Sequence, residues 1–396
     1  MATMTDKPDM KYFVFLCVFL KTFSALALDC KLLGHETLGQ QVLSEIDQAP
    51  FSCLKNNVHL TFDDGPSTTI TPEILKELKL RKTQGTFFVT TTNLDPSHPK
   101  YKENREIVKQ ALSEGHLIAD HGFEHHAHDL RMDAQGKVLE EGYDQNEREV
   151  QIKKSVDLLN WSTQGQFSKQ SPLLFRFPYG RGAMPSEKEL KHMAETRAVV
   201  FEGKTYSEQL KEYRQLSPAL QTLASSGFSH LGWNHDSHDS SYGVKAPADK
   251  ILSDYIIKNL KGLCSSPQIT KVALFHDIKE MNLSAIPLIM DIGKCLGLKF
   301  ISAKDMMMDQ SLSKTGVLID KNQILKGPVE NVIKGLEIAK HPSSSSCSNQ
   351  DIDKSCYSEQ YQKRYAHCSG GDSVCFEGKW YSSSDPLIKN NCHLQK

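Results

Sequence analysis

Short apolar segments alternate with helical patterns through most of the chain, and this alternation limits the fold more than any other feature. Segments 58–62, 85–90 and 117–120 have the length and the branched or aromatic content of strands. Between them, segment 71–78 begins with Thr71 as the expected N-cap before a proline, and segment 105–115 has one apolar face and a glycine stop. Such an order favours an α/β fold with a parallel sheet or barrel.

Polar motifs follow the predicted strands at their carboxyl ends. We expect further strands at 173–177, 230–234, 272–277 and 298–303. The motifs TFDDG, FRFPYG, WNHDSHD and LFHD all stand where a predicted strand ends. The strand ends of a barrel open on one shared mouth, so we expect motifs that are distant in sequence to meet there.

The N-terminus has the layout of a secretory signal peptide. Lys11 precedes an apolar run at 12–20, and small residues at 25–27 resemble a cleavage site. The run is short for a bilayer span, although an uncleaved membrane anchor is the alternative. We therefore expect a signal peptide at 1–27, a secreted or periplasmic protein, and membrane contact only through this segment. The net charge of −1 gives no indication of a nucleic-acid partner.

The remaining chain divides by composition. We expect a lead-in at 28–57, the main domain at 58–310, a linker at 311–346 and a small Cys-rich module at 347–396. Nine cysteines follow the predicted signal peptide, and five of them lie after residue 346, which in an exported chain indicates disulfides. Cys30 with Cys53 and Cys264 with Cys295 are the pairs we consider, although sequence alone leaves the connectivity open.

Two adjacent carboxylates end the first predicted strand. Asp63 and Asp64 are neighbours in an extended segment, so their side chains point in different directions. One of them could therefore bind a metal while the other serves as a base.

Segment 116–130 holds five of the sixteen histidines. On a helical turn, His121 and His125 would share one face, and so would His125 and His128. Two histidines and one carboxylate leave an open position for water, which is the layout of catalytic zinc. A histidine-rich metal-buffering protein is the alternative interpretation.

Two further motifs supply candidate partners for catalysis. Arg176 would orient a carboxylate and hold it ionised, and the turn after it could aim a backbone N–H at an oxyanion. His276 would be a general acid if Asp236 or Asp239 fixed its tautomer and raised its pKa.

Together, the blocks TFDDG, HGFEH, RFPYG, DSHD and LFHD resemble the polysaccharide deacetylase family, carbohydrate esterase family four, over roughly Val58 to Met308. The resemblance implies a distorted (β/α) barrel that removes acetyl groups from amino-sugar polymers or from acetylated xylan. It implies zinc, or another divalent metal such as cobalt. The implied ligands are Asp64, His121 and His125; the base is Asp63 with Arg176; the acid is His276 with Asp239; and Tyr179, Pro178, Leu274 and Trp233 would face the oxyanion and the substrate.

Three positions depart from the family pattern. Gly122 and His126 replace the usual residues in the second block, and Ser240 replaces a tryptophan that lines the groove. Trp233 or Tyr242 would compensate for that tryptophan. We interpret His126 and His128 as bystanders at the groove rim.

The predicted partner is a glycan. We favour the N-acetylglucosamine of peptidoglycan, then chitin or chitooligosaccharides, then acetylxylan. A non-catalytic glycan-binding protein is the rival from another class, but it would lack the base or the acid, and both are present. The sequence indicates no oligomeric state.

Overall fold

The computed structural model describes residues 30–196, 203–265 and 270–326, together with three strands between 365 and 382. The chain divides into two compact units, 1–328 and 329–396. The predicted signal peptide, and the predicted linker beyond residue 326, lie outside the described residues. Within those residues, no helix combines the length and the apolar character that crossing a membrane requires.

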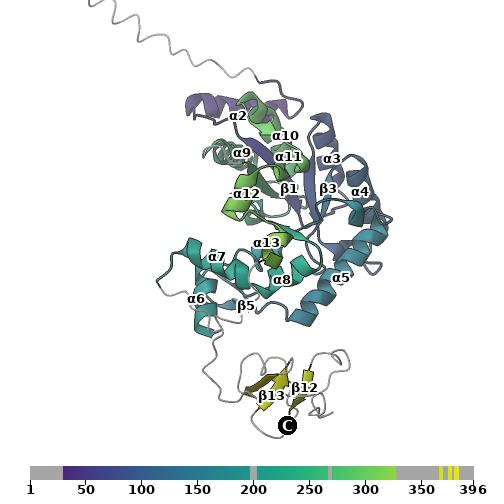
Figure 1. Ribbon diagram of the computed structural model, residues 1–396. Coiled ribbons are helices and arrows are strands. Elements are labelled where there is room, and N and C mark those ends of the chain that lie inside the picture. Colours follow the sequence, from purple (N-terminus) through teal and green to yellow (C-terminus); the bar gives the residue numbers. More distant parts are fainter. Residues whose placement is uncertain are drawn as a thin grey trace, which may run out of the picture. The chain divides into compact units, whose positions relative to one another are not determined.

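Nine strands of the first unit form one curled sheet (Figure 1). Their order is β11-β7-β6-β3-β2-β1-β9-β8, with β10 paired to the start of β1, and only the β11–β7 pairing is antiparallel among these nine. This confirms the predicted α/β class with a distorted barrel. The strands are β1 Asn57–Asp63, β2 Gly85–Val89, β3 Leu117–Asp120, β6 Leu174–Phe175, β7 Ser229–Leu231, β8 His235–Asp236, β9 Lys271–His276, β10 Lys299–Phe300 and β11 Leu318–Ile319.

Helices connect and cover these strands, and Figure 1 shows α3, α4 and α5 following one another along one side of the sheet. The helices are α2 Glu36–Gln48, α3 Thr71–Leu80, α4 Tyr101–Ser113, α5 Gln145–Ser162, α6 Glu187–Thr196, α7 Tyr206–Leu216, α8 Pro218–Ser225, α9 Asp249–Cys264, α10 Asn282–Cys295, α11 Ala303–Met307, α12 Gln310–Thr315 and α13 Lys321–Lys326.

Thr71 does not cap α3 as predicted. The N-cap position is held by Ile70, and Thr71 is the first residue of the helix. The Thr71 hydroxyl donates to Asp277 Oδ2 at 2.5 Å, and Asp277 directly follows β9. The start of α3 is therefore tied to the end of a neighbouring strand, beneath the carboxyl edge of the sheet.

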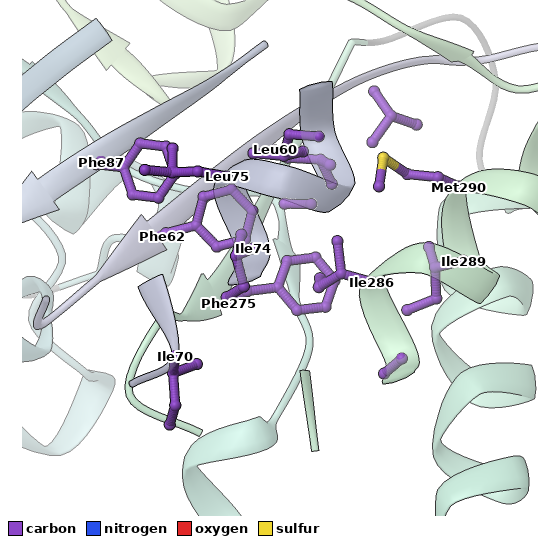
Figure 2. Packing of buried hydrophobic residues seen from close by; sticks show 14 of the residues in the cluster. Leu60, Phe62, Ile70, Ile74, Leu75, Phe87, Phe275, Ile286, Ile289 and Met290 are labelled. Carbon is purple, nitrogen blue, oxygen red and sulfur yellow. The ribbon is translucent and has the colours of Figure 1, made fainter. Parts of the chain in front are cut away.

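The central strand β1 separates two environments by simple alternation. Leu60 and Phe62 belong to the hydrophobic core that α3 and α10 cover, and Figure 2 shows the Phe62 ring between those of Phe87 and Phe275. The Phe62 and Phe87 rings stack with centroids 4.8 Å apart. The intervening residues of β1 are polar and point to the other face, because successive side chains of a strand alternate. That face carries the candidate site.

The main domain continues beyond the predicted boundary at residue 310. β11 pairs with β7 through Leu318 and Leu231, so segment 311–326 belongs to the sheet and its helices rather than to a linker. The predicted start of the linker is therefore wrong. A strand of two residues that completes a sheet edge has no recognisable pattern of its own, which is why the sequence did not reveal it.

The cysteine pairs that we considered are also wrong. The disulfides join Cys30 to Cys295 and Cys53 to Cys264. Cys295 ends α10 and Cys264 ends α9, so the lead-in segment is fastened to two helices of the main domain instead of to itself. Leu33 N–H also donates to Asp291 of α10 at 2.8 Å.

The second unit contains a three-stranded antiparallel sheet. Its strands are β12 Tyr365–Cys368, β13 Ser373–Phe376 and β14 Lys379–Ser382. The disulfides predicted for this module fall largely on residues outside the described part of the chain, and they stay a prediction.

Two buried histidines should make the free energy of unfolding depend on pH. Burial lowers the pKa of both His59 and His116 to about 4, against about 6.5 in an unfolded chain. Both ring nitrogens of His59 are hydrogen-bonded: Nδ1–H donates to Ile301 O at 2.9 Å, and Nε2 accepts from Thr86 Oγ1 at 2.8 Å. The unfolded chain binds more protons between pH 4 and pH 6.5, so this stabilisation is complete above pH 6.5 and is lost as the pH falls toward 4.

The contribution of His59 should be measured by comparing a variant with the wild type. This comparison is needed because two buried carboxyl groups change the free energy of unfolding in the opposite direction as the pH falls. Burial raises the pKa of Asp120 and of Asp277 to about 7, and their protonation relieves a cost as the pH falls. Urea unfolding at pH 7.5 and pH 5 should show a smaller loss of stability for His59→Gln than for the wild type, by roughly 1–2 kcal/mol. The exposed His35→Gln is the control and should match the wild type. If His59→Gln lost as much stability between pH 7.5 and pH 5 as the wild type, His59 would not contribute to the pH dependence of folding.

Candidate active site

The side chains that the sequence singled out meet at the carboxyl edge of the sheet. Asp63 ends β1, His121 directly follows β3, Arg176 directly follows β6, and His276 ends β9. These strands lie close together because β1 pairs with both β2 and β9, and β3 lies between β2 and β6. The prediction that distant motifs share one mouth is therefore confirmed in its geometry.

A buried ion pair organises the centre of the site. Arg176 Nη1 donates to Asp63 Oδ1 at 2.7 Å, and both side chains are almost fully buried. The other guanidinium hydrogens donate to Thr61 Oγ1 and to the carbonyls of Leu231 and Gly232, all at 2.8–2.9 Å. The guanidinium also lies 4.0 Å from the centroid of the Phe88 ring. These contacts fix the Arg176 guanidinium beside the Asp63 carboxylate.

Asp64, His121 and His125 form a cluster that could hold a metal ion, and their ligand atoms lie within 4.8 Å of one another. Asp64 Oδ1 is 3.4 Å from His121 Nε2 and 3.1 Å from His125 Nε2. Ligand bonds of about 2.0–2.1 Å in a tetrahedral zinc site would place the ligand atoms roughly 3.3–3.4 Å apart. Within the described part of the chain, Asp64 Oδ1 is buried without a hydrogen-bond donor of normal geometry. The residues therefore fit a divalent metal.

Neighbouring groups fix the orientation of His121 and lower the pKa of Asp64. His121 Nδ1–H donates to Arg176 O at 2.7 Å, which leaves Nε2 free to point at Asp64. A metal-binding histidine usually has its other ring nitrogen fixed in this way. Burial alone would raise the pKa of Asp64, but His121 and His125 beside it lower that pKa well below its usual range.

The two candidate histidine ligands do not lie on a helical turn, contrary to the prediction. Segment 121–130 is a loop, and both Gly122 (φ 84°) and His125 (φ 50°) have left-handed backbone conformations. The ring centroids of His121 and His125 are 5.0 Å apart. A loop, and not a helical turn, therefore brings the two rings together.

The structure separates the other two histidines of this run from the cluster. His128 is buried against the rings of Phe175, Phe177 and Tyr143, so its predicted place at a groove rim is wrong. His126 is partly exposed, and its Nδ1 lies 3.0 Å from Glu140 Oε2.

We therefore expect an asymmetric response of zinc binding to substitution. His125→Ala should lose the high-affinity zinc, because one of three converging ligand atoms disappears. His128→Phe should retain it, because the replaced ring packs among aromatic rings away from Asp64. Competition with a chromogenic chelator measures both affinities, and equal loss in the two variants would contradict the assigned ligand set.

His276 and Asp239 form a second coupled pair. His276 Nδ1–H donates to Asp239 Oδ1 at 2.6 Å, and Asn282 Nδ2 donates to Asp239 Oδ2 at 2.7 Å. Burial alone would lower the pKa of His276, but Asp239 and the carboxylates of the site raise it to about 9. Of the two partners considered, Asp239 is therefore the one in place, whereas Asp236 accepts from His238 N–H at 2.7 Å.

The turn after Arg176 and the segment after β7 border the cluster. Tyr179 has a left-handed backbone (φ 56°), its ring meets His125 edge-on with centroids 4.7 Å apart, and Pro178 is buried beneath it. Leu274 is buried on β9 two residues before His276, and therefore on the same face of the strand. Trp233 lies beside Gly180, whereas Tyr242 packs edge-on against Tyr255 of α9. Of the two aromatic candidates, Trp233 is the one next to this turn.

Several supporting residues escaped the sequence analysis. Asn93 Nδ2 donates to the carbonyls of Asp64 and Gly65 at 3.0 and 3.1 Å, which fixes the turn that presents Asp64. Ser155 Oγ–H donates to Asp120 Oδ1 at 2.5 Å beneath the histidine loop. A Cβ at Gly65 would overlap the Asp277 carboxylate, so that position requires glycine. Asn93 and Ser155 stand in no recognisable motif, and although Gly65 belongs to the TFDDG block, only the three-dimensional packing shows its contact with Asp277.

Comparison with known proteins agrees with this geometry. Residues 54–198 match the family model described as polysaccharide deacetylase, so this part of the chain is similar to that family. It is similar to a peptidoglycan-N-acetylglucosamine deacetylase of Bacillus cereus, with 34% identity over 126 residues, which are 32% of this chain and 37% of the relative. It is also similar to a chitooligosaccharide deacetylase of Rhizobium leguminosarum bv. trifolii, with 36% identity over 69 residues, or 17% of this chain and 29% of the relative.

The matches are partial, because the chain spans well under half the length of both curated relatives. Among solved structures, a polysaccharide deacetylase from Bacillus cereus aligns with 25% identity and a TM-score of 0.41, over 62% of this chain and 91% of that one.

Proposed function

We propose that this protein is a hydrolase that removes N-acetyl groups from the N-acetylglucosamine units of a glycan. The observation that carries the proposal is the meeting of three parts at one sheet edge: the Asp63–Arg176 pair, the His276–Asp239 pair and the three-ligand cluster. Amide hydrolysis needs a base for the attacking water, an acid for the departing amine and a means to stabilise the oxyanion.

The proposed roles of these residues are those that the resemblance to the family implies. Asp64, His121 and His125 would hold zinc or another divalent metal such as cobalt. When bound, that metal would polarise the acetyl carbonyl and lower the pKa of a water molecule beside it. Asp63, held by Arg176, accepts a proton from the attacking water.

His276 then gives a proton to the departing amine. With its pKa raised to about 9, it is protonated at neutral pH, and Asp239 keeps Nε2 directed at the site while Nδ1 is engaged. Its Nε2 lies 3.9 Å from Asp64 Oδ2, so the acid and the ligand cluster face the same reacting group. The backbone N–H of Tyr179 serves the oxyanion, and Leu274 and Trp233 wall the space for the acetyl group.

Peptidoglycan is the favoured substrate, because the relative with the longer of the two reported matches is named for it. Chitin or chitooligosaccharides come next, in agreement with the second relative, and acetylxylan third. The predicted signal peptide supports action outside the cytoplasm, at a cell wall.

Mass spectrometry of glycan fragments tests this proposal. Zinc-loaded protein should remove acetyl mass from peptidoglycan fragments faster than from chitooligosaccharides, and least from acetylxylan. Loss of acetyl groups from chitooligosaccharides alone would reverse the order of substrates. No loss from any of the three would overturn the proposed function.

A further inference from the structure

Tyr179 occupies a backbone conformation that its surroundings must maintain. Its φ of 56° and ψ of 7° lie in the left-handed region, which a bulky side chain rarely adopts. Such a conformation is unfavourable and persists only where other contacts hold it. The Tyr179 side chain is 38% exposed, so burial of the ring does not explain the conformation.

Arg131 supplies one of the contacts that hold this residue. Its guanidinium lies 3.7 Å from the centroid of the Tyr179 ring, and the same ring meets His125 edge-on. From the backbone side, Arg181 Nη1 donates to Tyr179 O at 2.8 Å. Arg131 comes from a two-stranded hairpin, β4 Arg131–Met132 and β5 Val138–Glu140, which lies outside the main sheet. A cation stacked on an aromatic ring in this way is attracted to the ring, and this contact helps to offset the cost of the Tyr179 backbone conformation.

Glu140, at the end of the same hairpin, connects Arg131 to the histidine loop. One carboxylate oxygen, Oε1, accepts from Arg131 Nη1. The other, Oε2, accepts from Ala127 N–H at 2.7 Å and lies 3.0 Å from His126 Nδ1. The Glu140 side chain is only 15% exposed, so these interactions are largely shielded from water. One carboxylate therefore fixes both the residue that packs on Tyr179 and the loop that presents His125.

We propose that Arg131 and Glu140, here called the hairpin latch, are positioning residues of the deacetylase site. The latch holds the Tyr179 backbone N–H and the His125 ring in a fixed relation to each other. His126 is then more than a bystander, since it shares the Glu140 carboxylate. This inference deepens the proposed function and rests on it, but its structural consequences can be measured without turnover.

Arg131→Ala tests the Tyr179 side of the latch. Steady-state acetate release from an acetylated chitooligosaccharide should show kcat lowered by roughly 10–100-fold with KM little changed, because the lost positioning acts on the transition state. Arg131→Lys should recover part of kcat, since a lysine can also stack on the ring. Amide hydrogen exchange of segment 178–182 should become faster in Arg131→Ala.

Glu140→Gln tests the loop side. The glutamine has one amide nitrogen where Glu140 has an oxygen. That nitrogen cannot accept a hydrogen bond, so the bond from either Arg131 or Ala127 N–H is lost. Zinc affinity should therefore fall by roughly tenfold or more, as for other residues that orient metal ligands. Lys137→Ala, an exposed cation in the same hairpin, is the matched control and should leave all three readouts unchanged.

The outcomes separate the inference from the proposed function. If the wild type releases acetate but Arg131→Ala keeps the wild-type kcat and exchange rate, the latch is overturned. If the wild type releases no acetate from any glycan, the proposed function fails, and the exchange and zinc measurements alone decide the latch. Wild-type zinc affinity in Glu140→Gln together with unchanged exchange in Arg131→Ala would then overturn it.

Discussion

Replacing Asp63 with asparagine should lower the rate of acetate release by about 10²–10⁴-fold, the usual contribution of a general base. The asparagine amide has nearly the shape of the carboxylate and can still accept from Arg176 Nη1, which donates to Asp63 Oδ1 at 2.7 Å. It cannot accept a proton from water at neutral pH. Zinc binding should survive, because Asp64, His121 and His125 are unchanged.

Asp157→Asn is the matched control for this experiment. Asp157 is exposed on α5, so the same change of charge there should leave the rate unaltered. Acetate release at the wild-type rate by a zinc-loaded Asp63→Asn protein would remove Asp63 from the role of base.

Arg176→Met should destabilise the fold by about 3–5 kcal/mol, because it leaves the Asp63 carboxylate buried without its partner. The side chain has no exposed surface, and its loss also strips donors from the carbonyls of Leu231 and Gly232. Unfolding in urea at pH 7 measures the change. The same variant should lose most of its activity, because Asp63 is no longer oriented.

A double variant separates the cost of an unpaired charge from the cost of lost packing. Asp63→Leu combined with Arg176→Met should recover part of the lost stability, because no buried charge is left without a partner. Lys76→Met removes half of an exposed ion pair with Glu73, and it should cost less than about 1 kcal/mol. Equal costs for Lys76→Met and Arg176→Met would mean that the buried pair contributes no more than a surface pair.

The fold was predictable where local pattern and tertiary environment agree. β1, β2, β3 and β9 appear within a few residues of their expected bounds. β2, β3 and β9 are largely apolar runs, as buried strands of a parallel sheet usually are, and β1 alternates apolar with polar residues. The two-residue strand β11 has no such run, and its antiparallel pairing with β7 depends on contacts across the sheet. The predicted disulfide pairs were wrong for a related reason. Cys30 and Cys53 each bond to a cysteine at the end of a helix that lies more than two hundred residues away in sequence.

The residues of the candidate site could be predicted where they stand in short sequence motifs. Asp63 and His276 end strands, Asp64 and His121 directly follow strands, and the strand order brings all four together. The local geometry of the histidine loop was not predictable, because left-handed residues such as His125 leave no pattern in the sequence. Supporting residues such as Glu140 and Asn93 are ordinary polar residues in sequence, and only their contacts reveal their roles.

Acetate release with and without a chelator tests the central claim most directly. The protein should release acetate from peptidoglycan fragments when zinc is bound, lose that activity after treatment with a chelator, and regain it when zinc is restored. His125→Ala should stay inactive through the same cycle at equimolar zinc. Undiminished acetate release from a metal-free protein, or none from the zinc-loaded wild type, would contradict the account of this site as a metal-assisted deacetylase.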